Sequence, residues 1–433
     1  MVNAFNQSLW GDEGFSAILS MKSLPDIIKT IANDTSPPLW NIFEWAIFNT
    51  LGTDEVYIRG LSFLFFLLTI FFVYLIGKHL FNKQTAILAS LLTLLNPFFF
   101  TYAFEGRMYS ILALGVTASM YFFLKRKWGG YIIATLWALY SHHFAIFALM
   151  IQGLWFVKEV LSKNKRVAKK MFKAFLFVGI GYIPWLIPLY NQTTKVSGGF
   201  WLSTPTISDI FTILADYLAK GIVSPLANIA LILALGILIV RRWKKQPSKT
   251  MFLISWFLGP IILTWVISQV FQSIFFNRYL LYTIPAVSLI LASSRRRVIS
   301  GTLSVLLILC FIQIDYHYFT NPSKIPFKDL ASFVKESRLE GDYLVNGDPG
   351  RHKLWETKYY GIPAPIYYPD GEGLPYFVGT ALMEDADIIN SLPNDINRLG
   401  VITERSFSEL NLDTFTIEEE KDFGGIKFLW LQK

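Results

Sequence analysis

The sequence predicts a polytopic α-helical membrane protein, with about ten transmembrane helices and a small C-terminal extracytoplasmic α/β domain. Of the 433 residues, 53% are apolar and only 16% carry a charge. Apolar runs of helix length recur through the middle of the chain, and basic side chains gather between them. A soluble domain of this size has more charged and fewer aromatic residues. A lipid bilayer is therefore the expected solvent of the central region.

Charge divides the chain into three predicted regions. Residues 1–56 hold 2 basic and 7 acidic side chains, residues 57–319 hold 25 and 5, and residues 320–433 hold 12 and 19. The basic excess lies in the loops of the membrane region, where it reports topology. We expect no nucleic-acid partner, since no recognition motif or exposed basic helix accompanies it. The predicted regions are a first extracytoplasmic loop (1–56), a transmembrane domain (57–319) and an extracytoplasmic accessory domain (320–433).

The first region contains the acidic motif SLWGDEGFS, with Asp12 and Glu13. Asp34 follows in NDTSPPLW, where two prolines favour an extended approach to the amphipathic run WNIFEWAIFNTLG. Taken alone, Asp12 and Glu13 fit two readings, a catalytic pair or carboxylates that favour the start of a helix. The residues by themselves leave both readings open.

A membrane-crossing helix needs about 20 mostly apolar residues. Residues 129–157 are long for one span, and Ser141, His142 and His143 interrupt them. Basic clusters flank this stretch on both sides, so we expect a hairpin of two short helices with the histidines at its outer bend. The other candidate spans are 57–77, 84–104, 108–124, 171–190, 221–240, 251–272, 278–293 and 298–314.

Loop charge then predicts the orientation. Cytoplasmic loops collect Lys and Arg, and ten spans place both acidic ends on the opposite, extracytoplasmic side of the cytoplasmic membrane. A polar start on that side is unusual, so we expect one more transmembrane helix upstream of residue 1. The five basic loops contain Lys78/Lys83, Lys125–Lys127, Lys158–Lys173, Arg241–Lys249 and Arg295–Arg297.

Residues 320–433 have only strand-length apolar runs, such as DYLVNG, PYFVG, RLGVIT and KFLWLQK, with a helix-like stretch at FKDLASFVKESRLE. No glycine-rich phosphate loop or metal-ligand cluster occurs there. We therefore expect an accessory or acceptor-side role for this domain. The single cysteine, Cys310, excludes a disulfide within the chain.

Several chemistry-bearing residues share the predicted outer face. Glu105 and Arg107 lie in FEGRMYS, His142 and His143 at the hairpin bend, and Arg278 in FFNRYLLY. A carboxylate base, cations for a leaving phosphate and aromatic surfaces are the parts that lipid-phosphate group transfer requires. Some of these residues also have simpler interpretations. An interfacial aromatic belt would account for Tyr109, Trp201 and Tyr279, and an interfacial anchor for Arg107. We interpret Asp209 and Asp216 as the polar edge of an outer helix.

Six runs in order carry a family resemblance: SLWGDEGFS, SPPLW, FEGRMYS, LYSHHFAIFAL, GGFWLSTPTISDI and FFNRYLLYTIPA. Across nearly all of residues 1–320 the chain resembles C-type (GT-C) glycosyltransferases of the protein mannosyltransferase and aminoarabinose transferase superfamily. The resemblance implies a hexosyl or pentosyl transferase that takes its sugar from undecaprenyl or dolichyl phosphate and inverts the anomeric centre. Its acceptor is a glycan, a lipid or a protein.

The resemblance also implies roles for individual residues. Asp12 is the implied general base, with Glu13 as its partner or as a conformational support, and Arg107 and Arg278 are implied to bind the donor phosphate. No cofactor or obligatory metal is implied, although a divalent metal stays an open alternative, and Ser36 replaces a histidine that many members have. The implied supporting residues are Asp34, Glu105, Tyr109, His142, His143 and Tyr279.

Three other functions compete with this one. A transporter or lipid flippase is also polytopic, but here the ionisable residues gather at one face, and no inverted repeat is recognisable. An O-antigen ligase or polymerase has a related fold and uses a diphosphate-linked donor. A scaffolding pseudoenzyme is the third alternative.

Overall fold

A computed structural model describes the whole chain except residues 1, 223, 294–296, 370 and 372, and the side chains of 297–301 and 303. The chain forms two compact units. The first contains Met1–Asp34, Asn41–Ile58 and Asn321–Lys433, and the second contains Thr35–Trp40 and Arg59–Thr320. The first unit thus combines segments from both ends of the sequence.

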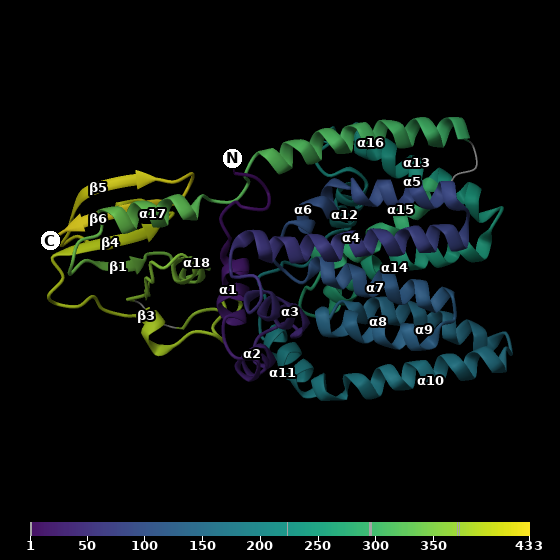
Figure 1. The fold of residues 1–433 in the computed structure, drawn as a ribbon, viewed down its shortest axis with the longest axis horizontal. Coiled ribbons are helices and arrows are strands. Elements are labelled where there is room, and N and C mark those ends of the chain that lie inside the picture. The colour runs from purple at the N-terminus through teal and green to yellow at the C-terminus, as the bar shows by residue number, and fades with distance from the viewer. Residues whose placement is uncertain (1, 223, 294–296, 370, 372) are drawn as a thin grey trace. The chain divides into compact units, whose positions relative to one another are not determined.

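The second unit is helical, and its helices run side by side as a bundle (Figure 1). Predicted basic-loop residues Arg295 and Arg296 lie outside the described residues. The helices are α4 (Glu55–Leu80, which starts in the first unit), α5 (Lys83–Leu94), α6 (Pro97–Ala103), α7 (Tyr109–Leu124), α8 (Trp128–Ser141), α9 (Ala145–Leu161), α10 (Lys165–Tyr182), α11 (Leu186–Ser197), α12 (Ile207–Ala219), α13 (Pro225–Trp243), α14 (Pro247–Val270), α15 (Ile284–Ala292) and α16 (Arg297–Thr320), with 3₁₀ helices η1 (Ile183–Trp185) and η2 (Asn277–Thr283).

Among the described residues, four helical segments are long and apolar enough to cross a membrane: Glu55–Leu80, Lys165–Ser197, Pro225–Trp243 and Pro247–Val270. The bent pair Lys83–Leu94 and Pro97–Ala103 makes a fifth if it counts as one span. Shorter apolar helices occupy Tyr109–Leu124 and Ser304–Thr320. The helical membrane fold is therefore confirmed, whereas the number of about ten spans stays a prediction.

Two interruptions in the helices follow from local sequence. The pair α5 and α6 bends by 64° at Asn96-Pro97, where the Asn96 side chain accepts a hydrogen bond of 3.0 Å from the Phe99 amide and starts a new helix. Residues 129–157 form two helices, as predicted, with the break at His142–Phe144. The second interruption places His142 and His143 on non-helical backbone.

In the first unit, a six-stranded sheet has the order β3-β2-β1-β4-β6-β5 (Figure 1). Strands β1 to β4 pair in parallel, while β6 runs antiparallel to both β4 and β5. The helices and strands of the first unit are α1 (Gly11–Ser20), α2 (Leu24–Ala32), α3 (Leu39–Phe48, which starts in the second unit), α17 (Phe327–Ser337), β1 (Tyr343–Asn346), α18 (Lys353–Tyr359), β2 (Ile366–Tyr367), η3 (Tyr376–Val378), η4 (Asp385–Asp387), β3 (Ile388–Ile389), β4 (Arg398–Thr403), η5 (Phe407–Glu409), β5 (Thr416–Asp422) and β6 (Lys427–Gln432).

Apolar residues alternate across the central strands and bury both faces of this sheet. Phe428 and Trp430 of β6 pack with α17 on one face, while Leu429 and Leu431 pack with Leu410 on the other. The predicted α/β structure of the C-terminal segment is confirmed, including the helix at α17 and the strands at β1, β4 and β6. The expected strand at PYFVG is wrong, because Tyr376–Val378 form a 3₁₀ helix that ends at Gly379 with φ of 92°.

Candidate functional site

The acidic motif forms the first turn of α1. Trp10 adopts extended backbone just ahead of the helix, and its amide donates a 3.4 Å hydrogen bond to Glu13 Oε2. Glu13 is fully buried, whereas the Asp12 side chain is 15% exposed. The capping reading thus applies to Glu13, and Asp12 is the carboxylate that solvent or substrate can reach.

Helix α18 of the C-terminal segment packs directly on this turn. A Cβ on Gly11 would lie 2.0 Å from the His352 Cβ, and a Cβ on Gly14 would lie 3.1 Å from the Trp355 carbonyl carbon. The two glycines, one helical turn apart, therefore let the backbones of α1 and α18 approach closely. Phe15 adds an edge-on contact with the Trp355 ring, at 5.3 Å between centroids.

This packing surrounds the carboxylates with ionisable groups of α18. His352 Nε2 lies 3.7 Å from Asp12 Oδ1. Burial raises the pKa of Glu356 to about 8, with Lys353 opposing the shift and the negative charges of Glu13 and Asp12 adding to it. Glu356 is thus mostly protonated at neutral pH. In its protonated form, Glu356 adds no third negative charge beside Asp12 and Glu13.

Lys353, only 4% exposed, anchors α18 to the sheet. Its ammonium bonds to the Asp348 carboxylate and lies 3.3 Å from Glu404 Oε1. Asp348 also accepts from Thr403 Oγ1 at 2.9 Å and from the Glu404 amide at 2.7 Å. Burial alone would raise the pKa of Asp348, but Lys353 and these hydrogen bonds outweigh it and lower the pKa. The network fixes the start of α18, and with it His352.

A second buried polar network holds α1 from its other side. Glu44 of α3 is fully buried and accepts hydrogen bonds of 2.7 Å from the hydroxyls of Ser16 and Ser20. The Asn41 side-chain amide donates to the same two hydroxyls at 3.0 Å. Buried hydrogen-bond networks of this kind rigidify an element. The acidic turn is therefore held from two directions.

In the second unit, Arg278 lies in an aromatic cradle. Its guanidinium carbon is 4.9 Å from the ring centroid of Phe276, 5.6 Å from that of Tyr109 and 5.7 Å from that of Tyr279. The Tyr109 and Tyr279 rings stack on each other at 6.3 Å. Arginine in such a setting keeps a fixed orientation and remains charged. The predicted Tyr109 and Tyr279 thus gather around the predicted Arg278.

Arg107 and His142 belong to the same neighbourhood. The positive charges of Arg107 and Arg278 both act on the His142 imidazole, whose ring lies 5.0 Å from that of Tyr279. His142 Nδ1 accepts a 3.1 Å hydrogen bond from the Phe144 amide, so in the neutral ring the proton sits on Nε2. Glu105 is buried, and its charge acts on Tyr102 together with that of Arg278. The supporting role of Glu105 stays a prediction.

His143 faces different partners. Its Nε2 lies 2.7 Å from Gln192 Oε1 of α11, and the Gln192 amide donates to the Ser36 carbonyl at 3.2 Å. His143 therefore links the hairpin bend to the Pro-Pro segment. The structure thus brings His142, and not His143, to the arginines.

Sequence reasoning missed two residues near Arg278. Asp216, read as the polar edge of a helix, accepts a 3.0 Å hydrogen bond from the Asn277 side chain and so holds the residue before Arg278. Lys220 lies over the rings of Phe98 and Tyr102, at 5.1 and 5.7 Å, and its charge acts on Asp216. The sequence offered one signal for Lys220, because it is an isolated basic residue on the predicted outer side of the membrane.

Two remaining predictions stay open. Asp34 follows α2 in the first unit, and its amide donates to the Ile31 carbonyl at 3.1 Å. Asp209 caps α12, accepting from the Thr206 amide at 2.6 Å.

In the part of the chain that the structure describes, no three His, Cys, Asp or Glu side chains form a group that could hold a metal ion. The expectation of metal independence is not tested by this.

Residues 35–187 match the family model described as dolichyl-phosphate-mannose-protein mannosyltransferase. No curated protein matches the chain significantly in sequence. Solved structures do match: ArnT from Cupriavidus metallidurans bound to undecaprenyl phosphate has 12% identity and a TM-score of 0.67, and its apo state 13% and 0.57, each alignment covering 99% of this chain and 95% of that chain.

An Archaeoglobus fulgidus oligosaccharyltransferase, solved in complex with Zn and sulfate, matches with 14% identity and a TM-score of 0.54. That alignment covers 91% of this chain and 64% of the oligosaccharyltransferase. The family match covers the corner with Arg107 and the hairpin bend with His142, and the structural matches extend over nearly the whole chain. The resemblance carried by the sequence motifs is confirmed at the level of the fold: residues 35–187 match the mannosyltransferase family model, and the chain has the fold of the solved ArnT and oligosaccharyltransferase structures.

Proposed function

We propose that the chain is an inverting glycosyltransferase that moves a sugar from a polyprenyl phosphate to an acceptor on the outer face of the cytoplasmic membrane. The observation that carries the proposal is the cradle of Arg278 with Tyr109, Tyr279 and His142. It occurs in a fold shared with a protein solved bound to undecaprenyl phosphate. Cations on an aromatic floor suit a phosphate that carries an isoprenoid chain.

The proposed reaction is a single displacement. An acceptor oxygen forms a bond to the anomeric carbon while the bond from that carbon to the phosphate oxygen breaks. The electron pair leaves with the phosphate, and the acceptor proton moves to the Asp12 carboxylate. One displacement inverts the anomeric centre without a covalent enzyme intermediate.

Arg107 and Arg278 are proposed to stabilise the charge that develops on the leaving phosphate. The Nε2 proton of neutral His142 is a further donor toward it. Glu13 holds the helix start, and His352 orients Asp12 at 3.7 Å. With cationic side chains at the phosphate, the proposal needs no obligatory metal, and metal addition to the assay tests this point.

The base assignment is tested with the full chain in vesicles and synthetic undecaprenyl-phosphate sugars, by the mass-spectrometric yield of undecaprenyl phosphate. Because general base catalysis contributes about 100- to 10,000-fold, Asp12→Asn should lower the rate at least about 100-fold. Its binding of undecaprenyl phosphate should be unchanged. Asp26→Asn, an exposed carboxylate of the same unit, is the control. Full activity in Asp12→Asn would refute the assignment.

Donor binding is tested separately, with undecaprenyl phosphate as the probe. A hydrogen bond to a charged group contributes about 1.5–3 kcal/mol, so Arg278→Ala and Arg107→Ala should each weaken binding about 10-fold or more. Arg241→Ala, an exposed arginine at the C-terminal end of α13, should bind normally. Unchanged affinity in both site variants would exclude the proposed phosphate contact.

A further inference from the structure

The second unit has a cavity of about 220 Å³ at a place remote from Arg278. Phe123 and Leu124, at the end of α7, line it, whereas Tyr109 of the aromatic cradle starts the same helix. Sixteen helical residues separate the two ends by about 24 Å. The cavity therefore lies at the end of the bundle that bears the basic loops.

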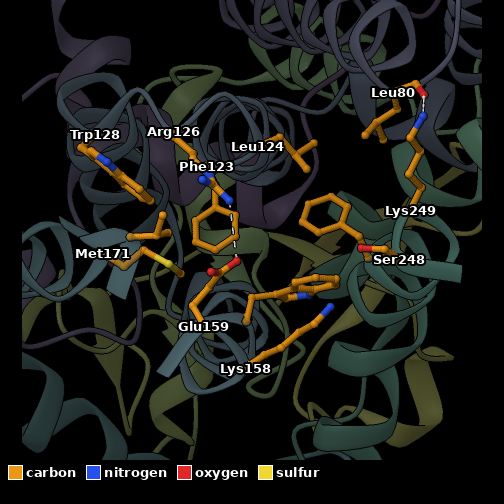
Figure 2. Close-up of a pocket in the computed structure, with 13 residues that line it drawn as sticks. Leu80, Phe123, Leu124, Arg126, Trp128, Lys158, Glu159, Met171, Ser248 and Lys249 are labelled. Atoms are coloured by element: carbon orange, nitrogen blue, oxygen red, sulfur yellow. Dashed lines mark hydrogen bonds and ion pairs between the residues drawn. The ribbon is translucent and has the colours of Figure 1, made fainter. Parts of the chain in front are cut away.

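Three cations and one carboxylate line this cavity (Figure 2). Arg126 Nη2 is 3.7 Å from Glu159 Oε1, and the Arg126 side chain is 56% exposed. Lys158 Nζ lies 4.3 Å from the Trp155 ring centroid, and Lys249 Nζ donates to the Leu80 carbonyl at 2.6 Å. The lining thus carries an excess of two positive charges.

The ammonium groups of Lys158 and Lys249 have neutral partners, an indole face and a carbonyl. Within the part of the chain that the structure describes, neither forms a salt bridge. Each ammonium has three N–H donors, so both keep donors for an anion. The Ser248 hydroxyl lines the same cavity.

The rest of the lining is apolar and aromatic. Trp128 and Trp155 line the cavity, and Met171 contributes from α10 (Figure 2). Tryptophan is enriched where lipid headgroups meet hydrocarbon. On the two helices that line this side, Leu161 and Phe172 are 77% and 57% exposed, as expected of lipid-facing residues. The cavity thus combines cationic lining groups with apolar, exposed residues on the helices beside it.

We propose that this cavity binds the phosphate of an anionic membrane phospholipid, with Lys158, Lys249 and Arg126 holding the phosphate. A volume of about 220 Å³ accepts a headgroup, while the acyl chains remain along α9 and α10. Basic pockets between transmembrane helices on the cytoplasmic side are sites of this kind. The bound lipid would join the ends of α4, α7, α9 and α14, and so stabilise the bundle at the end away from the aromatic cradle.

The test uses the full chain in nanodiscs of phosphatidylcholine, with or without about a quarter phosphatidylglycerol. The protein is re-extracted, and retained phosphatidylglycerol is counted by native mass spectrometry. The double variant Lys158→Gln/Lys249→Gln should bind phosphatidylglycerol at least about 10-fold more weakly, because it loses two charge-assisted hydrogen bonds to the phosphate. The thermal stabilisation by phosphatidylglycerol should disappear with it.

The matched control is Lys169→Gln/Lys244→Gln, which removes the same charge from exposed positions near the same end of the bundle. Equal loss in both double variants would overturn the proposal in favour of diffuse surface attraction. Displacement of phosphatidylglycerol by equimolar inorganic phosphate, or by equimolar undecaprenyl phosphate, would overturn it in favour of those ligands. Unchanged undecaprenyl-phosphate binding by Lys158→Gln/Lys249→Gln, together with lost phosphatidylglycerol, shows a folded protein and supports it.

Discussion

Glu356 is the buried carboxyl group of α18, and its protonation couples stability to pH. Burial raises its folded-state pKa to about 8 from an ordinary value of 4.5, so ionisation opposes folding. The cost is absent below the ordinary pKa, grows as pH rises, and is complete above about pH 8. Glu356→Gln removes this cost, which is about a few kcal/mol in the free energy of unfolding. It should therefore raise the melting temperature at pH 9 and leave it nearly unchanged at pH 5.

The measurement is thermal unfolding of the full chain in detergent across that pH range. Glu340→Gln removes an exposed carboxylate from the same unit and is the control. A parallel shift of the two variants would show that net charge, and not burial of Glu356, governs the response. Equal stabilisation by Glu356→Gln at pH 5 and pH 9 would contradict the raised pKa.

The adjacent histidines show what a sequence can and cannot predict at the scale of a residue. Loop charge placed both His142 and His143 at one bend, and the helix break at that position is confirmed. Their side chains diverge, because one ring packs on Tyr279 and the other hydrogen-bonds to Gln192. Residue type and spacing do not encode that choice, which depends on helices brought together by tertiary packing.

At the scale of an element, Gly11 is the tightest point between α1 and α18. A Cβ there would lie 2.0 Å from the His352 Cβ and 3.2 Å from its Cα, so the helices must separate. Overpacking of this kind costs about 1–3 kcal/mol. We expect Gly11→Ala to lower thermal stability and to lower the transfer rate, because His352 moves away from Asp12.

Gly350→Ala is the matched control, since a Cβ at that position meets nothing within 4 Å. It should match the unmodified protein in melting temperature and in transfer rate. Gly11→Ala with unchanged stability and full activity would mean that the close approach of α1 to α18 is unnecessary.

Elements with clear periodicity were predictable, and those without it were not. The helix α17 and the strands β4 and β6 follow from long, patterned apolar runs. Helix α18 has only seven residues and is largely buried, including Lys353 and Glu356. Charged residues that are buried through pairing hide the amphipathic pattern on which a sequence prediction depends. The sequence therefore singled out neither His352 nor Glu356, and the accessory role of residues 320–433 stays a prediction.

At the scale of the whole molecule, the acidic motif and the C-terminal segment fold as parts of one unit. Gln7 accepts from the amides of Ser323 and Lys324 at 3.0 and 3.1 Å, and Glu55 accepts from Lys328 and Tyr360, both at 2.8 Å. Charge had shown that both ends are acidic, but similar charge does not predict association. Contacts between residues 273 to 317 positions apart lie beyond any local pattern.

The orientation in the membrane is a prediction about the whole molecule, and the single cysteine makes it directly testable. In a Cys310→Ser background, Ser162→Cys reports the loop after α9 and Ser203→Cys the loop before α12, both at exposed positions. Positively charged loops stay cytoplasmic. A membrane-impermeant maleimide should therefore label Ser203→Cys in intact cells and label Ser162→Cys only after permeabilisation. The Cys310→Ser protein without a new cysteine gives the background, and the reverse labelling pattern would place the Arg278 cradle on the cytoplasmic side.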